Sequence, residues 1–252
     1  MTGFGGKGDA ALFGKKDHRG SIVITIDYFS DVLCIWAYGG QIRLAELQRE
    51  FAGDILVRQH FMPLFADTRV RIGGGWKDKG GFVGFGQHMQ EVCRQWDHIR
   101  LHADVWSECR PTSCTSAHVF LKAAGLCLDL ESVDEDSDAE ACARFERLVV
   151  RVRTAFFEQA RDISSLPVLL DLLQSGDPDR GDVMRRIESG EAYAALHRDE
   201  QLLKDHGVVG SPTYVFNDGR QLLYGNVGYR IIASNLRELM SAHRVEGQPS
   251  WC

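Results

Sequence analysis

A single cysteine lies between a predicted strand and a predicted helix, and this junction constrains the fold more than any other feature. Residues 21–29 are rich in β-branched and aromatic side chains, which is typical of a strand. Residues 41–51 carry apolar side chains at near-helical spacing. Cys34 is therefore predicted at a helix start, where free backbone N–H groups and the helix dipole favour a thiolate. The alternative is a buried structural cysteine, since free cysteines are often buried.

The position that would complete a dithiol motif holds alanine. A Cys-x-x-Cys sequence after a strand indicates a redox site, but Ala37 stands where the second cysteine would be. A mixed disulfide formed at Cys34 must then be resolved by another thiol. That thiol is glutathione, a thiol of a partner protein, or a distant cysteine of this chain.

A second pattern, in residues 207–224, predicts a β-hairpin. Asp218 and Gly219 lie between two apolar runs, which is a strong signal for a tight turn between strands. Pro212 stands at the beginning of the first run, where a strand tolerates proline. The sequence leaves both the cis and the trans isomer of the Ser211–Pro212 bond open.

Together these segments resemble the DsbA-like branch of the thioredoxin superfamily. The resemblance is strongest to FrnE-like proteins, 2-hydroxychromene-2-carboxylate isomerases and kappa-class glutathione transferases, and it spans nearly the whole chain. It implies an α/β protein with a thioredoxin-like fold and a large α-helical insertion. The motifs that carry it are Phe29–Tyr38, Ala117–His118, Asp162–Ser164, Gly210–Thr213 and Tyr224–Arg230.

The resemblance also implies roles for individual residues. Cys34 would be the attacking thiol, and Pro212 would be cis and would face it. The backbone of Ser211 would pair with a peptide or with glutathione, and Trp36 would flank the site. The segment from Gly225 to Arg230, which includes Asn226 and Arg230, would help to close the thiol-ligand site.

The chain departs from both branches of this group, so three functions stay open. Oxidoreductases have a second cysteine at the position of Ala37, whereas isomerases and transferases commonly have serine at the position of Cys34. The first function, which we favour, is a thiol-disulfide oxidoreductase of single-thiol type with glutathione or another thiol as resolver. The second is a glutathione-dependent isomerase or transferase. The third is a non-enzymatic carrier of sulfur as a persulfide.

Two other cysteines are candidates for the resolving thiol. Cys114 follows Ser113 at a predicted helix start, where it would gain thiolate character, although a passive packing role is the stronger expectation. Cys252 ends the chain and could reach Cys34, but terminal residues are usually disordered. The remaining cysteines show neither Cys-x-x-Cys pairing nor zinc spacing and are expected in the core: Cys93, Cys109, Cys127 and Cys142.

The chain divides into four predicted parts. Residues 21–72 and 206–244 would form the thioredoxin-like domain, and residues 73–205 a glycine-rich loop followed by the α-helical insertion. Residues 1–20 and 245–252 would be flexible ends. The glycine-rich stretch does not have the spacing of a nucleotide-binding motif, and it is either a lid over the thiol site or an ordinary surface loop.

Composition narrows the partners and the compartment. The formal net charge of −6 argues against nucleic-acid binding. No signal peptide and no membrane-spanning run are visible, and the odd number of seven cysteines favours a reducing interior, so a cytoplasmic protein is expected.

No bound cofactor or metal is expected; His98 and His102 lack a third ligand. The expected partners are a low-molecular-weight thiol, with glutathione as cosubstrate, or a protein disulfide or thiol. A homodimer stays open because related isomerases and transferases often dimerise.

Overall fold

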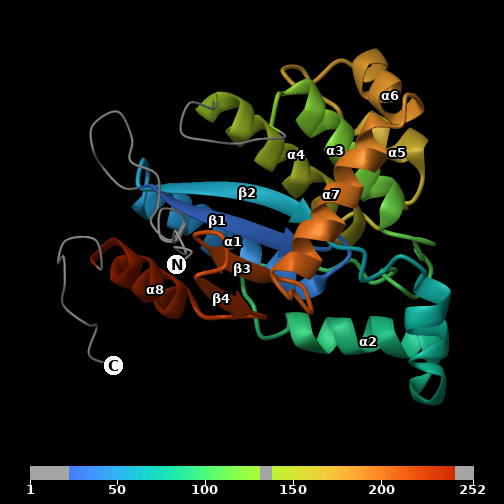
Figure 1. The fold of residues 1–252 in the computed structure, drawn as a ribbon. Coiled ribbons are helices and arrows are strands. Elements are labelled where there is room, and N and C mark those ends of the chain that lie inside the picture. The colour runs from blue at the N-terminus through green and yellow to red at the C-terminus, as the bar shows by residue number, and fades with distance from the viewer. Residues whose placement is uncertain (1–22, 131–137, 242–252) are drawn as a thin grey trace, which may run out of the picture.

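A four-stranded mixed sheet lies at the centre of the computed structural model, which describes residues 23–130 and 138–241 (Figure 1). The strand order is β2-β1-β3-β4. β1 and β2 are parallel, whereas β3 is antiparallel to both of its neighbours. The predicted flexible ends 1–20 and 245–252, together with Cys252, lie outside the described residues. The strands span Ile24–Ser30 (β1), Ile55–Phe61 (β2), Thr213–Phe216 (β3) and Gln221–Tyr224 (β4).

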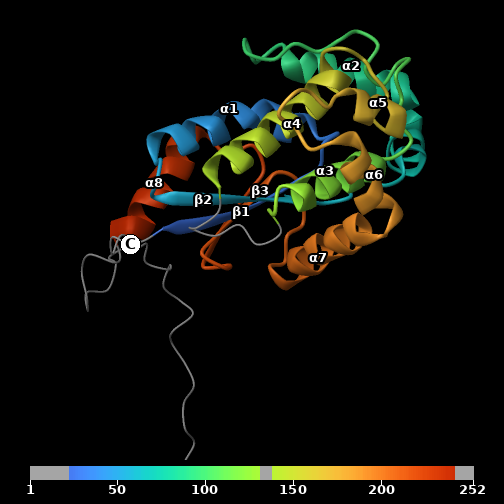
Figure 2. The ribbon, with the colours of Figure 1, turned by 90° about the horizontal axis from the view of Figure 1, so that it is seen from above.

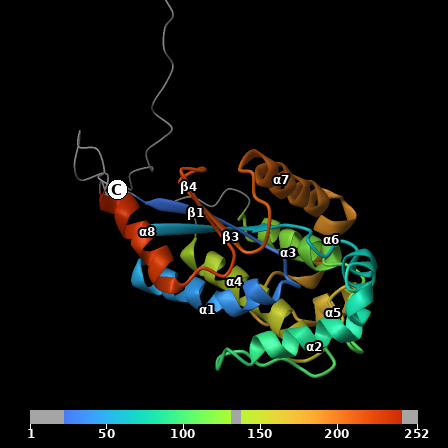
Figure 3. The ribbon, with the colours of Figure 1, turned by 90° about the horizontal axis from the view of Figure 1, so that it is seen from below.

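Helices cover both faces of the sheet (Figures 2 and 3). α1 (Ile35–Glu50) and α8 (Tyr229–Ser241) lie on one face, and α7 (Glu191–Asp205) lies on the other. The alternation of side chains along β1 produces this arrangement. Ile26 and Tyr28 pack in the cluster that contains Leu44 of α1, while Phe29 packs on the opposite face in the cluster that contacts α7.

The insertion between β2 and β3 is helical. A single π-helical turn, η1 (Arg69–Gly74), and a 3₁₀ turn, η2 (Lys77–Lys79), lead into its longer helices. Asp138 begins one of these helices by accepting a hydrogen bond from the backbone N–H of Glu140, as expected for a carboxylate at a helix start. The helices are α2 (Gly81–Cys93), α3 (Thr115–Cys127), α4 (Ala139–Phe157), α5 (Leu166–Asp171), α6 (Arg180–Glu188) and α7. None of the helices in the described ranges is long and apolar enough to cross a membrane.

The glycine-rich stretch after residue 73 is mostly helical, which corrects the prediction of a loop. Gly73 and Gly74 end η1, and residues 81–86 form the first turns of α2. The glycines permit close backbone contacts: a Cβ on Gly84 would lie 1.7 Å from the carbonyl oxygen of Lys79, and one on Gly86 would lie 2.8 Å from that of Val105. These contacts explain why glycine is required there without any break in the helix.

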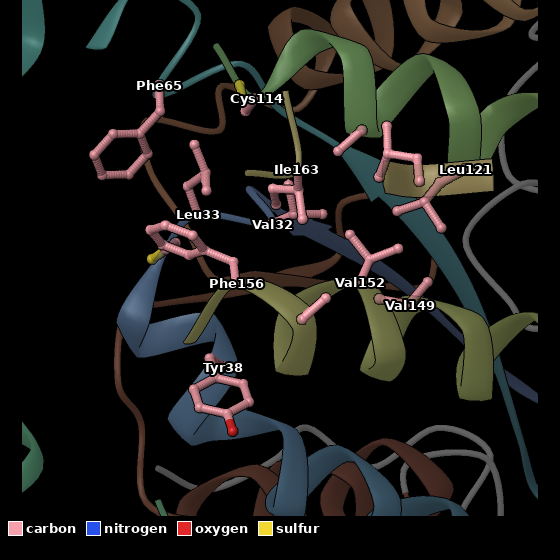
Figure 4. Packing of buried hydrophobic residues seen from close by; sticks show 14 of the residues in the cluster. Val32, Leu33, Tyr38, Phe65, Cys114, Leu121, Val149, Val152, Phe156 and Ile163 are labelled. Atoms are coloured by element: carbon pink, nitrogen blue, oxygen red, sulfur yellow. The ribbon is translucent and has the colours of Figure 1, made fainter. Parts of the chain in front are cut away.

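The main core connects the insertion with the end of β1. Val32 and Leu33, which follow β1, are completely or almost completely buried. They pack among side chains of α3 and α4, including Leu121 and Phe156 (Figure 4). The loop that leads to Cys34 is therefore part of the core and has little freedom to move.

A buried polar network fixes the insertion to the face of the sheet that α7 covers. His60 of β2 lies between two carboxylates, with Nε2 2.8 Å from Asp27 Oδ1 and Nδ1 2.9 Å from Asp199 Oδ1. Lys122 of α3 donates to the same oxygen of Asp199 over 3.0 Å. Burial opposes protonation of the imidazole, but the two carboxylates prevail and raise the pKa of His60. The network joins β1, β2, α3 and α7.

Two neighbouring glycines of α1 provide a matched test of this packing. A Cβ on Gly39 would lie 2.4 Å from the ring of Trp96, whereas one on Gly40 would meet nothing closer than 3.8 Å. We expect Gly39→Ala to lower the free energy of unfolding by about 1–3 kcal/mol through overpacking. Gly40→Ala should raise it by about 0.5–1 kcal/mol, because alanine is the better helix former. Urea unfolding of both variants checks this, and equal effects of the two substitutions would contradict the packing of Trp96 on α1.

Candidate functional site

Cys34 is the N-cap residue of α1, as its sequence context predicts. Its backbone is extended, with φ −82° and ψ 114°, and the helix begins at the next residue. A turn delivers the chain from β1, in which Cys34 N–H donates to the carbonyl oxygen of Asp31 over 3.1 Å. The side chain is 5% exposed. The thiol therefore lies at the start of a helix but is largely shielded from solvent.

The loop before β3 lies against this thiol. The Ser211–Pro212 peptide bond is cis, which agrees with what the resemblance implies. Cys34 Sγ donates to the carbonyl oxygen of Ser211 over 3.3 Å. Ser211 Oγ in turn accepts the backbone N–H of Asp31 over 2.9 Å. The two chemically prominent segments, which are far apart in the sequence, therefore meet at Cys34.

Burial changes the acidity predicted for this cysteine. Burial raises the pKa of the Cys34 thiol, and the charge of Asp31 adds to this effect. Hydrogen bonds from Ser211 and from the backbone N–H groups of Ala37 and Trp36 act in the opposite direction. The net result is a raised pKa of the Cys34 thiol. The prediction that the helix start makes Cys34 a ready thiolate is therefore wrong for this structure, because burial outweighs the helix N–H groups.

A cavity of about 460 Å³ opens next to the thiol. We call it the Cys34 cavity. Trp36 is 36% exposed on its wall and makes an edge-to-face contact with Trp96, with the ring centroids 5.3 Å apart. The cavity is lined by Leu33, Cys34, Ile35, Trp36, Leu64, Phe65, Arg71, Ile72, Gly75, Trp76, Phe85, His88, Met89, Val209, Gly210, Ser211 and Tyr224.

The lining of the Cys34 cavity is aromatic and cationic. Among the described residues, Cys34 is its only cysteine, and no aspartate or glutamate lines it. Arg71 of η1 lies over the ring of Phe65, 4.8 Å from the centroid. His88 of α2 packs against Trp76 at 5.1 Å between ring centroids. In a chain with net charge −6, this is a local environment suited to an anionic ligand with apolar parts.

Cys114 is close to the site but is not positioned as an accessible thiol. It is completely buried and does not line the Cys34 cavity. Burial, followed by the charge of Asp31, raises the pKa of the Cys114 thiol far above its ordinary value. The predicted thiolate character of Cys114 is therefore wrong. Ser113 caps α3 by accepting the N–H of Thr115 over 3.0 Å, and it does not line the cavity either.

The segment after β4 does not reach the cavity. Asn226 and Arg230 are exposed, and neither contributes to the lining. Asn226 accepts a hydrogen bond from Arg43 of α1. Its neighbour Tyr224, at the end of β4, contributes to the wall instead. The sequence thus identified the correct region but not the residue that lines the cavity.

One group of potential metal ligands occurs in the described residues. Asp31, Cys114 and His118 place one donor atom each within 4.8 Å of one another. Both carboxylate oxygens of Asp31 already accept backbone N–H groups, and so does His118 Nε2. These donors are therefore engaged in holding the fold. His98 and His102 bind backbone groups, the carbonyl of Gly39 and the N–H of Asp104 respectively.

Of the cavity residues contributed by the insertion, Trp76 and Phe85 lie in the stretch that was predicted as a lid over the thiol site or a surface loop, whereas the others were not predicted. Arg71, Trp76, Phe85, His88 and Met89 lie in segments that show no catalytic motif, and only tertiary packing brings them to Cys34. Asp31 and His118 belong to motifs quoted above, but no role was assigned to them. The position of Asp31, directly after a buried strand and before a helix start, was a usable signal, because aspartate often hydrogen-bonds backbone N–H groups in such turns.

Three solved structures that share this fold are informative. A putative protein disulfide isomerase from Nitrosomonas europaea matches with a TM-score of 0.62 and 18% identity, over 90% of this chain and 100% of that chain. The cytosolic disulfide reductase DsbM from Pseudomonas aeruginosa with GSH matches with a TM-score of 0.56 and 19% identity, over 87% and 97%. A 2-hydroxychromene-2-carboxylate isomerase matches with a TM-score of 0.55 and 18% identity, over 87% and 98%. At this identity the likeness shows the fold alone.

These matches confirm the predicted thioredoxin-like fold with a helical insertion. No curated protein matches the chain in the sequence comparison. The model of the DSBA-like thioredoxin domain matches residues 25–237, a range that contains Cys34, the insertion and Pro212. Since this match covers most of the chain, the protein belongs to the DSBA-like thioredoxin domain family.

Proposed function

We propose that the protein is a single-thiol disulfide oxidoreductase that uses Cys34 as nucleophile and glutathione as resolving thiol. The observation that carries the proposal is the position of Cys34. It is the only cysteine, among the described residues, that lines the cavity, and it faces the Ser211–Pro212 loop from the start of α1. The neighbour DsbM is described as a cytosolic disulfide reductase with GSH, which supports a glutathione-linked reaction in the cytoplasm.

The reaction would proceed through two exchanges. The Cys34 thiolate attacks the glutathione sulfur of a mixed disulfide, which forms a bond between Cys34 and glutathione and expels the substrate thiolate. A second glutathione thiolate then attacks the bound glutathione sulfur. This step releases glutathione disulfide and restores Cys34. One free glutathione is therefore consumed for each mixed disulfide that is reduced, and the other half of the glutathione disulfide comes from the substrate. The backbone N–H groups of Trp36 and Ala37 stabilise the Cys34 thiolate that leaves.

One observation favours the glutathione-dependent isomerase or transferase as a second candidate. The Cys34 thiol is a hydrogen-bond donor to the carbonyl oxygen of Ser211, and burial raises the pKa of this thiol. A neutral thiol of this kind could donate to the sulfur of a bound glutathione thiolate without itself reacting. In that case Cys34 would position the ligand, and a serine at the same position would do the same.

The reaction with glutathione disulfide distinguishes these candidates. Reduced protein exposed to glutathione disulfide should form one mixed disulfide, which excess reduced glutathione removes. Cys34→Ser should abolish this adduct, and Cys114→Ser should retain it, because Cys114 does not line the cavity. Intact-mass spectrometry measures both. A wild-type protein that stays unmodified, with a Cys34→Ser variant that still turns over an electrophile with glutathione, would favour the isomerase or transferase. A stable adduct that glutathione does not remove would favour a carrier role.

The pH dependence follows from the direction of the pKa shift. Because the pKa of Cys34 is raised, the thiol is mostly protonated at neutral pH. The rate of adduct formation should therefore increase about tenfold per pH unit between about pH 6 and pH 8, in step with the thiolate fraction. This rate is obtained by quenching the reaction at a series of times and measuring the fraction of adduct by mass spectrometry. A rate that is constant from about pH 6 upward would mean that Cys34 is already a thiolate.

A further prediction concerns Arg71, the arginine that lines the Cys34 cavity. Arg71→Met should weaken glutathione binding by about 10- to 150-fold, because a hydrogen-bonded charge pair contributes on the order of 1.5–3 kcal/mol, while the methionine keeps the apolar contact with Phe65. Lys79→Met is the matched control, since Lys79 lies over Trp76 but does not line the cavity. Isothermal titration of both variants in Cys34→Ser protein measures binding without the exchange reaction. Equal affinities in the two variants would remove Arg71 from the ligand site.

A further inference from the structure

Asp31 connects the turn that carries Cys34 to two other parts of the chain. Its carboxylate Oδ1 accepts the N–H of Leu33 over 2.8 Å, and Oδ2 accepts the N–H of Phe65 over 2.9 Å. Its own N–H donates to Ser211 Oγ over 2.9 Å. The side chain is completely buried. Asp31 thus fixes the turn before the nucleophile, the Ser211 loop and Phe65, which forms a wall of the cavity.

His118 of α3 completes the support of this turn. Its Nε2 accepts the N–H of Val32 over 3.2 Å and lies 3.7 Å from Asp31 Oδ1. An imidazole nitrogen that accepts an N–H carries no proton, and burial lowers the pKa of His118. The imidazole is therefore neutral. In the described ranges no lysine or arginine forms an ion pair with Asp31, so its negative charge has no cationic partner.

Asp31 and Cys34 belong to the same turn, and the charge of Asp31 adds to burial in raising the pKa of the Cys34 thiol. Cys34 is three residues further along the chain, and its N–H donates to the carbonyl oxygen of Asp31 over 3.1 Å. A negative charge at such a position disfavours a second negative charge on the thiol. The hydrogen bond from Cys34 Sγ to Ser211 O has the same effect, because it requires the sulfur to keep its proton.

We propose that Asp31 is a positioning residue whose charge adds to burial in keeping Cys34 protonated in the resting protein. Its hydrogen bonds hold the turn, and its charge limits the reactivity of the thiol. The inference rests on the proposed function only in taking Cys34 as the reacting group.

Other ionisable groups around this turn come from the neighbouring elements. Arg71 and His88 line the cavity but are exposed to solvent, which screens their charge. Buried Arg153 of α4 donates to Ser30 Oγ over 2.8 Å. Burial raises the pKa of Tyr28 to about 12, so its phenol is neutral. The remaining groups are Cys114, which is also neutral, and Tyr224 on the cavity wall.

The pH profile of Cys34 alkylation by iodoacetamide tests the proposal. Trypsin releases residues 20–43 as one peptide in which Cys34 is the only cysteine, so its modification can be followed alone. Asp31→Asn should lower the midpoint of the profile by about one pH unit. Because the nucleophilicity of a thiolate falls with its pKa, the variant should react about three times faster near pH 7 and slower than wild type at high pH. The two profiles should therefore cross.

His118→Ala is the matched control. It removes the acceptor for Val32 N–H, which loosens the same turn, but it removes no charge because His118 is neutral. A loosened turn should change the rate at all pH values in the same direction and leave the midpoint unchanged. If the Asp31→Asn profile keeps the wild-type midpoint and does not cross the wild-type profile, Asp31 is only structural and the proposal is overturned.

The wild-type protein provides a measurement that does not depend on the folding of a variant. Its Cys34 midpoint should lie above the ordinary cysteine value of about 8.5, and a midpoint below that value would overturn the proposal even if Asp31→Asn does not fold. The test is also separate from the glutathione reaction. A midpoint that is lower in Asp31→Asn than in the wild type, without any glutathione adduct, would reject the proposed function and support the role of Asp31.

Discussion

The hydrogen bonds of the turn from Asp31 to Cys34 are the constraint on which the site depends. This turn ends the central strand and begins α1, and its backbone N–H groups are bound by Asp31, Ser211 and His118. These partners come from the turn itself, the loop before β3 and the helical insertion. Buried N–H groups need such partners. The position of the nucleophile is thus determined jointly by the sheet and by the insertion.

The insertion gives the site its chemical character. The thioredoxin-like part supplies Cys34, Ser211 and Pro212, which are the groups that the proposed thiol exchange would use. Arg71, Trp76 and His88 come from the helical segments and make the cavity aromatic and cationic. On the other side of the sheet, the ion pairs of His60 and Asp199 hold the insertion in place. The sulfur of Cys34 therefore comes from the thioredoxin-like part, at the start of α1, while the insertion contributes much of the cavity wall.

The sequence predicted the parts of this site that depend on local patterns. The strand ending near Phe29, the helix after Cys34 and the hairpin around Asp218 follow from periodicity and turn chemistry, and the structure contains all three. The acidity of Cys34 could not be predicted in this way, since it depends on burial by residues from distant segments. The positions of Arg71 and His88 in the cavity wall could not be predicted either, because the packing of distant segments brings them there. The helical glycines of α2 were misread because close backbone contacts, not turns, explain them.

The pairing of β1 with β3 has a consequence for how the protein is made. The central strand lies between β2 and β3, and Asp31 binds Ser211 across 180 residues of sequence. Contacts of such long range form late, because a large loop must close first. At a synthesis rate of about 5–20 residues per second, the first half of the site would wait on the order of ten to forty seconds for its partner. During that interval β1 has an open edge and Cys34 lacks its Ser211 contact, so a nascent chain is open to chaperones and to oxidation in a way that the folded protein is not.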